Sequence, residues 1–394
     1  MDQPYLKKWG FIVFISMLST IPPLATDMYM PALPQMVDVF NTTTTLTSFT
    51  MTIFFVFMAI GILIFGPLSD KYGRKRILIV SISTTFIFSI LCSLSPTIEF
   101  LIVVRAIQAL GAGGMVTTAT ALIRDSFSGK EMTKVLSITQ SLGFLAPMLA
   151  PLIGAFILAY FDWSKAFVAL AIMNAISLFV AFFLKETLPV DKRTKDGVLQ
   201  SVFSTVTVLK NKTFTGYFLV GSILTAPFMA YIAVASYVYI NGFGVSETTF
   251  SIYFAITSAV TVLGPLLYMR FGQKSVRFNF IAVFILIVVS GTLIMTVGKL
   301  SPVLFLLSFV VFAIAATYFR PMISTLILQS QTTNIGAASA MMNFGFTLVG
   351  SLAMFIGSQA WTSYVTGIAM TIFMFYSVAL VILVISLKRK VISL

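Results

Sequence analysis

The chain of 394 residues contains no histidine and only one cysteine, Cys92. The lack of histidine excludes a His-based catalytic site or a His metal cluster, and a single cysteine excludes an internal disulfide framework. Charged residues are also scarce, at 9%, whereas a soluble domain carries roughly 25%. We therefore predict that the chain is not an enzyme and holds neither a metal nor a cofactor.

Apolar stretches of about 20 residues, the length that a helix needs to cross a bilayer, recur along the whole chain. Inside a bilayer the backbone must bond to itself, so membrane spans are helices or closed barrels. The stretches do not alternate apolar and polar residues as barrel strands do. We predict an all-α membrane protein with twelve transmembrane helices. The predicted spans are 10–34, 46–68, 77–95, 98–123, 135–160, 165–184, 214–240, 247–269, 278–298, 302–328, 336–360 and 363–387.

The longest polar stretch lies near the middle of the chain. We expect residues 185–213 to be a cytoplasmic linker between an N-terminal six-helix bundle, 1–184, and a C-terminal six-helix bundle, 214–394. Gly66-Pro67-Leu68 in the first half is echoed by Gly264-Pro265-Leu266 in the second. This echo favours two pseudo-symmetric halves, which is a common plan among transporters.

The net charge of +13 comes from cations spread over short loops rather than gathered in one patch, so nucleic acid is not a predicted partner. If the N-terminus lies in the cytoplasm, 21 of the 25 Lys and Arg residues fall on the cytoplasmic side, as the positive-inside rule requires. We predict a monomer in the bilayer of a bacterial inner membrane, with both termini in the cytoplasm. We read the first apolar run as a retained helix and not as a signal peptide.

Asp27 is the only acidic residue that we place inside a predicted span, in its outer half. A medium of low polarity favours the protonated form of a carboxylic acid, so a buried carboxyl can exchange a proton for a cargo molecule. The alternative is that the first span starts late and leaves Asp27 among the outer headgroups.

Two cations, Arg105 and Arg320, also fall within spans. Arg320 is close enough to the cytoplasmic end to extend its charge toward water. Arg105 is deeper, where a charge is costly and usually marks a transport pathway. Its alternative role is structural, because a guanidinium can satisfy backbone carbonyls and tie helices together.

The loop after the second span reads Gly66-Pro67-Leu68-Ser69-Asp70-Lys71-Tyr72-Gly73-Arg74-Lys75-Arg76. We expect Gly66 to let a neighbouring helix approach and Gly73 to permit a tight turn. Asp70 can face the dipole of another helix, and Arg74 can pair with Asp125. The loop closely resembles the signature loop of the major facilitator superfamily, a family of membrane transporters. The resemblance implies that these residues form a latch that works during conformational change.

Two further motifs resemble the same superfamily. The run that begins with Arg105-Ala106-Ile107-Gln108 is similar to a motif linked there to proton coupling. The run from Asp27 to Pro34, with Tyr29 inside it, resembles one branch, the bicyclomycin- and chloramphenicol-resistance exporters called Bcr/CflA. The resemblance implies that Asp27 is the proton- or substrate-linked acid and that Tyr29 lies near the cavity.

The fifth span carries small residues and prolines at spacings that favour one helix side. These are Gly143, Pro147, Ala150, Pro151 and Gly154. The prolines bend the helix and the small residues permit tight contact. The set resembles the antiporter motif of drug exporters in its Bcr/CflA form. A kinked packing helix without antiport is the alternative.

Met and aromatic residues, which can repack around differing shapes, are abundant, with 39 Phe, 20 Met and 13 Tyr. The candidate residues of a cargo cavity are Tyr29, Gln108, Gln140, Phe144, Tyr231, Tyr237, Asn343 and Phe346. We predict a proton-coupled antiporter that exports small hydrophobic, drug-like molecules by alternating access. With one buried acid, a neutral or zwitterionic cargo fits better than a dication.

Two alternatives to this function stay open. The same fold can export an endogenous metabolite, such as a siderophore or a purine, or take up cargo by symport. A non-transporting membrane sensor or membrane enzyme is disfavoured, because the loops are too short for a sensing domain.

Overall fold

The computed structural model describes residues 3, 5–194, 197–272, 275–331 and 335–392. The side chains of Gln140 and Phe144, two predicted cavity residues, lie outside the described part. Within the described ranges the regular structure is entirely helical, which confirms the predicted all-α class.

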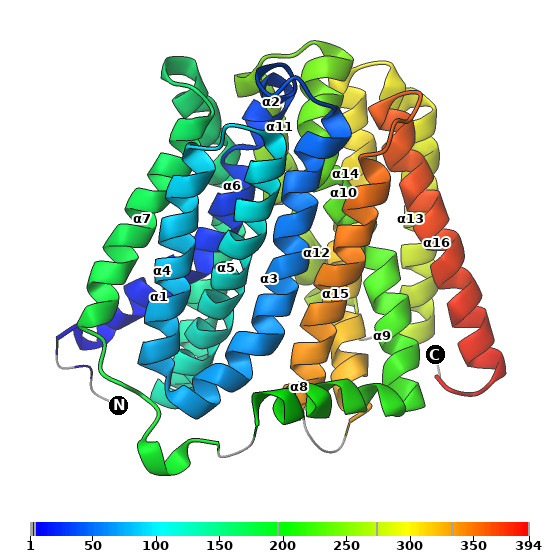
Figure 1. The fold of residues 1–394 in the computed structure, drawn as a ribbon. Coiled ribbons are helices and arrows are strands. Elements are labelled where there is room, and N and C mark those ends of the chain that lie inside the picture. The colour runs from blue at the N-terminus through cyan, green and yellow to red at the C-terminus, as the bar shows by residue number, and fades with distance from the viewer. Residues whose placement is uncertain (1–2, 4, 195–196, 273–274, 332–334, 393–394) are drawn as a thin grey trace. The chain divides into compact units, whose positions relative to one another are not determined.

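The first compact unit comprises residues 1–32, 39–42 and 53–203. Helix α4 packs against α5 and α7, and α1 packs against α5, α6 and α7 (Figure 1). The unit is built from α1 (Lys7–Asp27), η1 (Met30–Ala32), most of α3 (Thr44–Tyr72), α4 (Arg74–Ser93), α5 (Ile98–Ser126), α6 (Gly129–Tyr160), α7 (Ser164–Phe182), η2 (Val190–Lys192) and the first part of α8 (Val198–Thr207).

The second unit comprises residues 33–38, 43–52 and 204–394. Helix α14 packs against α9, α12 and α13, and α10 packs against α15. The unit is built from α2 (Leu33–Val39), the start of α3, η3 (Val208–Lys210), α9 (Lys212–Thr225), α10 (Pro227–Ser236), the π-helix η4 (Tyr237–Gly242), α11 (Glu247–Thr261), α12 (Leu263–Phe271), α13 (Val276–Met295), η5 (Val297–Lys299), α14 (Pro302–Gln329), α15 (Ile335–Gly357) and α16 (Tyr364–Lys388).

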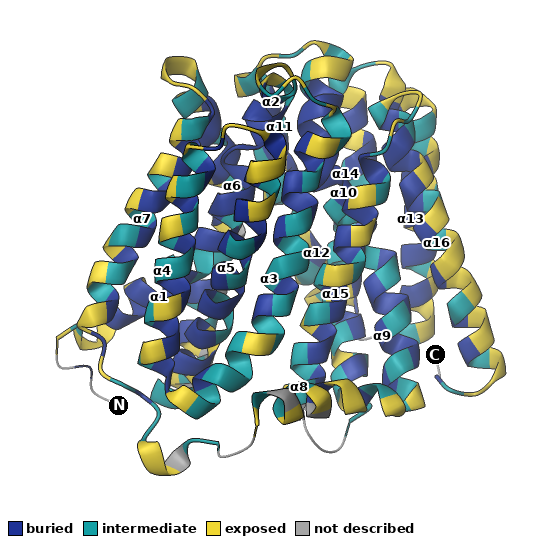
Figure 2. Cartoon of the chain, in the orientation of Figure 1, coloured by how far each residue is buried: buried dark blue, intermediate teal, exposed yellow. Residues whose placement is uncertain are grey.

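Eleven stretches of helix in the described part are long and apolar enough to cross a membrane. Helix α6 has 32 residues and a shorter described apolar stretch, Leu145–Tyr160. It corresponds to the fifth predicted span, 135–160, which is the one span that these eleven stretches do not include. Large apolar side chains such as Phe156, Phe179 and Val381 are exposed, and exposed residues occur along many of the helices (Figure 2). Exposed apolar faces of this extent fit contact with lipid hydrocarbon.

Three predicted continuous spans are interrupted, and a proline explains each interruption. Proline has no N–H group and its ring clashes with the carbonyl four residues earlier. Helix α1 therefore ends at Asp27, four residues before Pro31, and α11 ends at Thr261, four residues before Pro265. The seventh span breaks at Pro227, which starts α10.

The contacts also assign two short segments of the first half to the second unit, which the sequence did not predict. Ser48 donates to the carbonyl of Ala233 at 3.2 Å. The Tyr237 hydroxyl donates to the carbonyl of Leu33 at 3.3 Å and is also hydrogen-bonded to Thr47. Residues 185–213, expected to be a polar linker, contain helix α8.

Candidate functional site

Asp27 is the last residue of α1, and its side chain is only 3% exposed. The Thr26 hydroxyl donates to its Oδ1 at 2.8 Å. Because α1 ends here, the acid lies at a helix end, and the next residue, Met28, caps the helix through its N–H, which donates to the carbonyl of Leu24 at 3.1 Å. The structure therefore encloses Asp27 in protein and does not leave it in external solvent.

Arg105 of α5 lies in the same unit and is completely buried. Its Nη1 donates to the carbonyl of Ala25 at 2.9 Å and to Gln108 Oε1 at 2.8 Å. Its Nη2 donates to the Tyr29 hydroxyl at 3.4 Å. These bonds join α5 to the end of α1, so Arg105 does tie helices together, as its alternative role supposed.

Aromatic rings surround the Arg105 guanidinium. Its central carbon lies 4.2 Å from the ring centre of Phe54, 4.8 Å from that of Tyr29 and 5.6 Å from that of Phe167. Attraction between a desolvated cation and ring faces is worth about 2 kcal/mol in favourable cases. The rings therefore replace part of the hydration that Arg105 loses on burial.

Asp27 and Arg105 do not form an ion pair among the interactions of the described residues, although Arg105 is close enough to act electrostatically on the carboxyl. The Arg105 Nε–H is buried and has no hydrogen-bond partner in the described part of the chain. The site thus combines an acid that is not locked to a cation with a cation that keeps one unused donor. Such a pair can change its arrangement when a proton or a cargo molecule arrives.

We had predicted that Gln108 lines a cargo cavity. It does not line an open cavity, because it is completely buried between α4 and α5. Its Oε1 accepts from Arg105 and its Nε2 donates to Ser89 Oγ at 2.7 Å. Both ends of the amide are therefore occupied by protein. Gln108 positions Arg105 and connects it to α4.

The tight packing predicted for the small residues occurs at some positions only. A Cβ atom on Gly154 of α6 would collide with the backbone carbonyl of Met28, next to Asp27. One on Gly111 of α5 would lie 2.6 Å from the carbonyl of Ser81. At Gly66 and Gly143 a Cβ atom would meet nothing within 4 Å. The prediction that Gly66 permits close approach of a helix is therefore wrong, and Gly143 makes no such contact either.

The remaining small and proline positions of the fifth-span motif differ in burial. Ala150 and Pro151 are buried in α6, whereas Pro147 is only partly buried. Both prolines lie inside the helix. The motif therefore packs most closely at its Gly154 end.

The loop after α3 brings its predicted charges together. Arg74 is 2% exposed, and its guanidinium pairs with Asp70 at 2.6 Å and with Asp125 at 2.9 Å. Gly73 has φ +99°, a conformation that glycine adopts without strain. The expected turn and charge cluster are both present in this unit.

Glu186 belongs to the same cluster, and sequence reasoning missed its role. Its carboxylate accepts from the backbone N–H of Arg74 at 2.9 Å and of Lys75 at 3.2 Å. These are the first residues of α4, where a negative charge is favourable. Glu186 therefore faces the N-terminus of α4. An acid directly beside Lys185, at the end of the sixth predicted span, was the available signal.

Replacing Gly73 with Val is expected to slow transport several-fold while cargo binding changes by less than about twofold. A side chain at φ +99° is strained, and its Cβ would collide with the Glu186 carboxylate. The loop must then shift away from α4. Counterflow rates and cargo affinity in reconstituted vesicles measure the two effects. Gly66→Ala is the matched control, because that position is open, and loss of binding in Gly73→Val would contradict the latch role.

The predicted cavity residues of the second unit do not form one cluster. Tyr231 is buried and stacks on Phe309 at 3.9 Å between ring centres, and its hydroxyl lies 3.3 Å from Thr257 Oγ1. Tyr237 is also buried and stacks on Tyr364. Asn343 is exposed, and Phe346 is buried. Tyr231 therefore belongs to an aromatic core rather than to an accessible surface.

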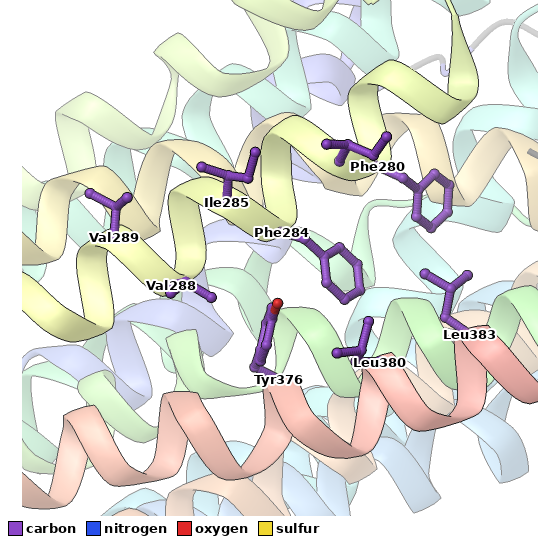
Figure 3. Close-up of a pocket in the computed structure, with 9 residues that line it drawn as sticks. Phe280, Phe284, Ile285, Val288, Val289, Tyr376, Leu380 and Leu383 are labelled. Carbon is purple, nitrogen blue, oxygen red and sulfur yellow. The ribbon is translucent and has the colours of Figure 1, made fainter.

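A groove in the second unit lies elsewhere (Figure 3). It encloses about 360 Å³ between α13 and α16 and is lined almost entirely by apolar side chains. Phe284 and Tyr376 face each other across it (Figure 3). None of the predicted cargo residues lines the groove. We do not assign it to the candidate site.

Two bundles of apolar helices, with an acid and an arginine buried side by side in one of them, define a polytopic membrane transporter. The chain belongs to the Major Facilitator Superfamily, whose family model matches residues 12–354. The predictions of a transporter for small molecules, of a multi-pass membrane protein and of a protein that is not an enzyme are confirmed by this membership.

The relatives are bacterial. The chain is 31% identical over 354 residues to an uncharacterised MFS-type transporter, YdgK, of Bacillus subtilis, which covers 88% of each chain. It is 26% identical over 265 residues to a bicyclomycin resistance protein homolog of Haemophilus influenzae, covering 67% of each. The second relative confirms the resemblance to the Bcr/CflA branch.

The fold is shared with solved structures. A crystal structure of a POT family transporter in complex with a thioalcohol conjugated peptide superposes with a TM-score of 0.77 over 100% of this chain and 99% of that one. The two sequences are 13% identical. This likeness concerns the fold alone.

Proposed function

We propose that the chain is a proton-coupled exporter of small hydrophobic, drug-like molecules in the inner membrane of a bacterium, with both termini in the cytoplasm. The observation that carries the proposal is the buried Asp27 carboxyl, which makes no ion pair among the described residues although a buried Arg105 is close by. Intramembrane ionisable groups usually mark ion or substrate pathways.

Asp27 is the group that exchanges the proton. In the state open to the cytoplasm its carboxylate, beside Arg105, takes part in binding the cargo. After the binding site opens to the outside, a proton from that side adds to the carboxylate and the cargo leaves. The protonated acid then returns to the cytoplasmic side and releases its proton there, so that one proton enters for each cargo molecule that leaves.

Three observations support export of drug-like cargo. The relative from Haemophilus influenzae is named for bicyclomycin resistance. The run from Asp27 to Pro34 matches the pattern of that branch. The motif on α6 touches the α1 backbone directly beside Asp27, at the contact between Gly154 and Met28.

Expression in an efflux-deficient bacterial host is expected to raise the inhibitory concentration of some compounds in a panel of uncharged and zwitterionic hydrophobic antibiotics. The compound with the largest change is then added to de-energised inverted vesicles that contain a trapped pH dye. An exporter that exchanges cargo for protons makes the vesicle interior more alkaline. Vesicles without the protein serve as the control.

Two outcomes would contradict the proposal. If no compound in the panel changes its inhibitory concentration, drug export is wrong and an endogenous cargo becomes the better candidate. If the vesicle interior turns acidic when cargo is added, the proton and the cargo move in the same direction, and the protein is a symporter.

A further inference from the structure

A second arginine lies in the membrane-spanning part of the chain. Arg320 belongs to α14 and precedes Pro321 inside that helix. Its side chain is exposed, in contrast with the completely buried Arg105. The sequence led us to expect that Arg320 extends toward the cytoplasmic surface, and its neighbours point to a different role.

Helices of the second unit enclose the face of α14 that carries Arg320. The guanidinium lies over the ring of Phe346 on α15, 5.2 Å from its centre. One turn on, Ile323 packs on Gly221 of α9. On the other side, Gly264 of α12 meets the backbone at Thr317 so closely that a Cβ atom would not fit. Arg320 is therefore accessible and yet flanked by α9, α12 and α15, and it does not lie on an outer face toward lipid.

No negative charge pairs with Arg320 in the described part of the second unit. Among the described residues, the Arg320 guanidinium forms no ion pair and no hydrogen bond. Its one contact there is with the ring of Phe346. Beyond residue 196 the sequence contains a single acid, Glu247. Glu247 begins α11, 17 residues before Gly264, or about 25 Å of helix rise from the level of Thr317.

A guanidinium within a membrane-spanning segment is costly unless its donors are used. The Arg105 donors bind protein oxygens, whereas those of Arg320 are free to bind an external group. The planar fork of an arginine matches the paired oxygens of carboxylate, sulfonate or phosphate groups. The buried ring of Phe346 lies under the guanidinium and holds it in place through the contact of the cation with the ring face.

We propose that Arg320, positioned by the buried ring of Phe346, forms a subsite for cargo that carries an anionic group on an apolar body. This inference rests on the proposed function and narrows its cargo class to amphipathic anions and zwitterions. Arg320 binds the anionic group, and Phe346 positions the guanidinium. The proton exchange stays with Asp27, which belongs to the other unit.

Two fluorescent probes that share one skeleton test the subsite in proteoliposomes of the full-length protein. 8-Anilinonaphthalene-1-sulfonate is a permanent anion near neutral pH, and N-phenyl-1-naphthylamine lacks its sulfonate. Saturable binding is measured against protein-free liposomes. Arg320→Gln is expected to weaken binding of the anion about tenfold, which is the loss of one charge-assisted contact, and to leave binding of the uncharged probe unchanged. Arg320→Lys keeps the charge without the fork, so we expect an intermediate affinity.

Arg277→Gln is the matched control, because it removes the same charge from an exposed position at the start of α13. Equal losses of anion binding in Arg277→Gln and Arg320→Gln would show a general surface attraction and overturn the proposal. Equal losses of both probes in Arg320→Gln would also overturn it, because they would show a structural role. Unchanged anion binding in that variant would overturn it directly.

The same vesicles separate this inference from the proposed function. If the wild type binds the anion through Arg320 but accumulates neither probe when a proton gradient is applied, the subsite stands and proton-coupled export fails. If both probes are transported and Arg320→Gln affects neither, export stands and the subsite fails.

Discussion

Replacing Asp27 with Asn is expected to abolish proton-driven efflux while the protein still inserts and folds. Asn has nearly the same shape as Asp, and its amide oxygen can accept the hydrogen bond that Thr26 now donates. It cannot take up or release a proton. Cells that express the variant should be as drug-sensitive as cells without the transporter, and the variant should release no proton when cargo binds. Membrane abundance and thermal stability should stay close to wild type.

Two variants make the Asp27 prediction specific. Asp162→Asn removes an acid from the exposed turn between α6 and α7 and should leave efflux unchanged. Asp27→Glu keeps a carboxylic acid but lengthens it in a tightly enclosed position, so partial activity is expected. Normal proton-driven efflux by Asp27→Asn would show that another group carries the proton, and the proposed mechanism would be wrong.

Replacing Arg105 with Gln has the second largest expected effect, which is loss of cargo-coupled proton exchange. The change removes the cation beside the acid and removes the donor that binds the Ala25 carbonyl. Each buried group left unsatisfied costs about 1–3 kcal/mol. Against this, the fold no longer has to bury an unpaired charge. We therefore expect only a small change in the melting temperature beside a complete loss of exchange.

The comparison with Arg105→Lys distinguishes a functional from a structural role. Lysine keeps the positive charge but cannot reproduce the planar fork that reaches both Ala25 and Tyr29. Slow but measurable proton exchange in the lysine variant, with none in the glutamine variant, is the expected pattern. If Arg105→Gln loses stability and keeps proton release upon cargo binding, Arg105 only joins helices.

The contacts that could be predicted from the sequence join residues that lie close together along the chain or within one motif. Asp70 and Arg74 are one helical turn apart, and their ion pair follows from that spacing. Burial of Asp27 followed from the apolar run around it. The helix ends at Asp27 and Thr261 were not predicted, although each precedes a proline by four residues, because helices of this chain also continue through prolines, as at Pro147.

Contacts that depend on the path of the chain in space were not predictable. Glu186 is more than a hundred residues from Arg74, and nothing near Gly73 in the sequence indicates that a carboxylate will fill that turn. Gln108 carries an amide that could face a cavity or a neighbouring helix, and only the position of Ser89 on α4 decides between them. The surroundings of Arg320 likewise depend on α9, α12 and α15, which lie far from it in sequence.

The contact between Gly154 and the Met28 carbonyl couples two parts of the molecule mechanically. At this point α6 has no side chain to act as a spacer, so a tilt of α6 must push directly on the peptide that follows Asp27. Because α1 has already ended there, that peptide can yield without distorting a helix. In the proposed cycle, the tilt of α6 would then determine which aqueous compartment Asp27 faces, and a bulkier residue at position 154 should restrict the movement of both.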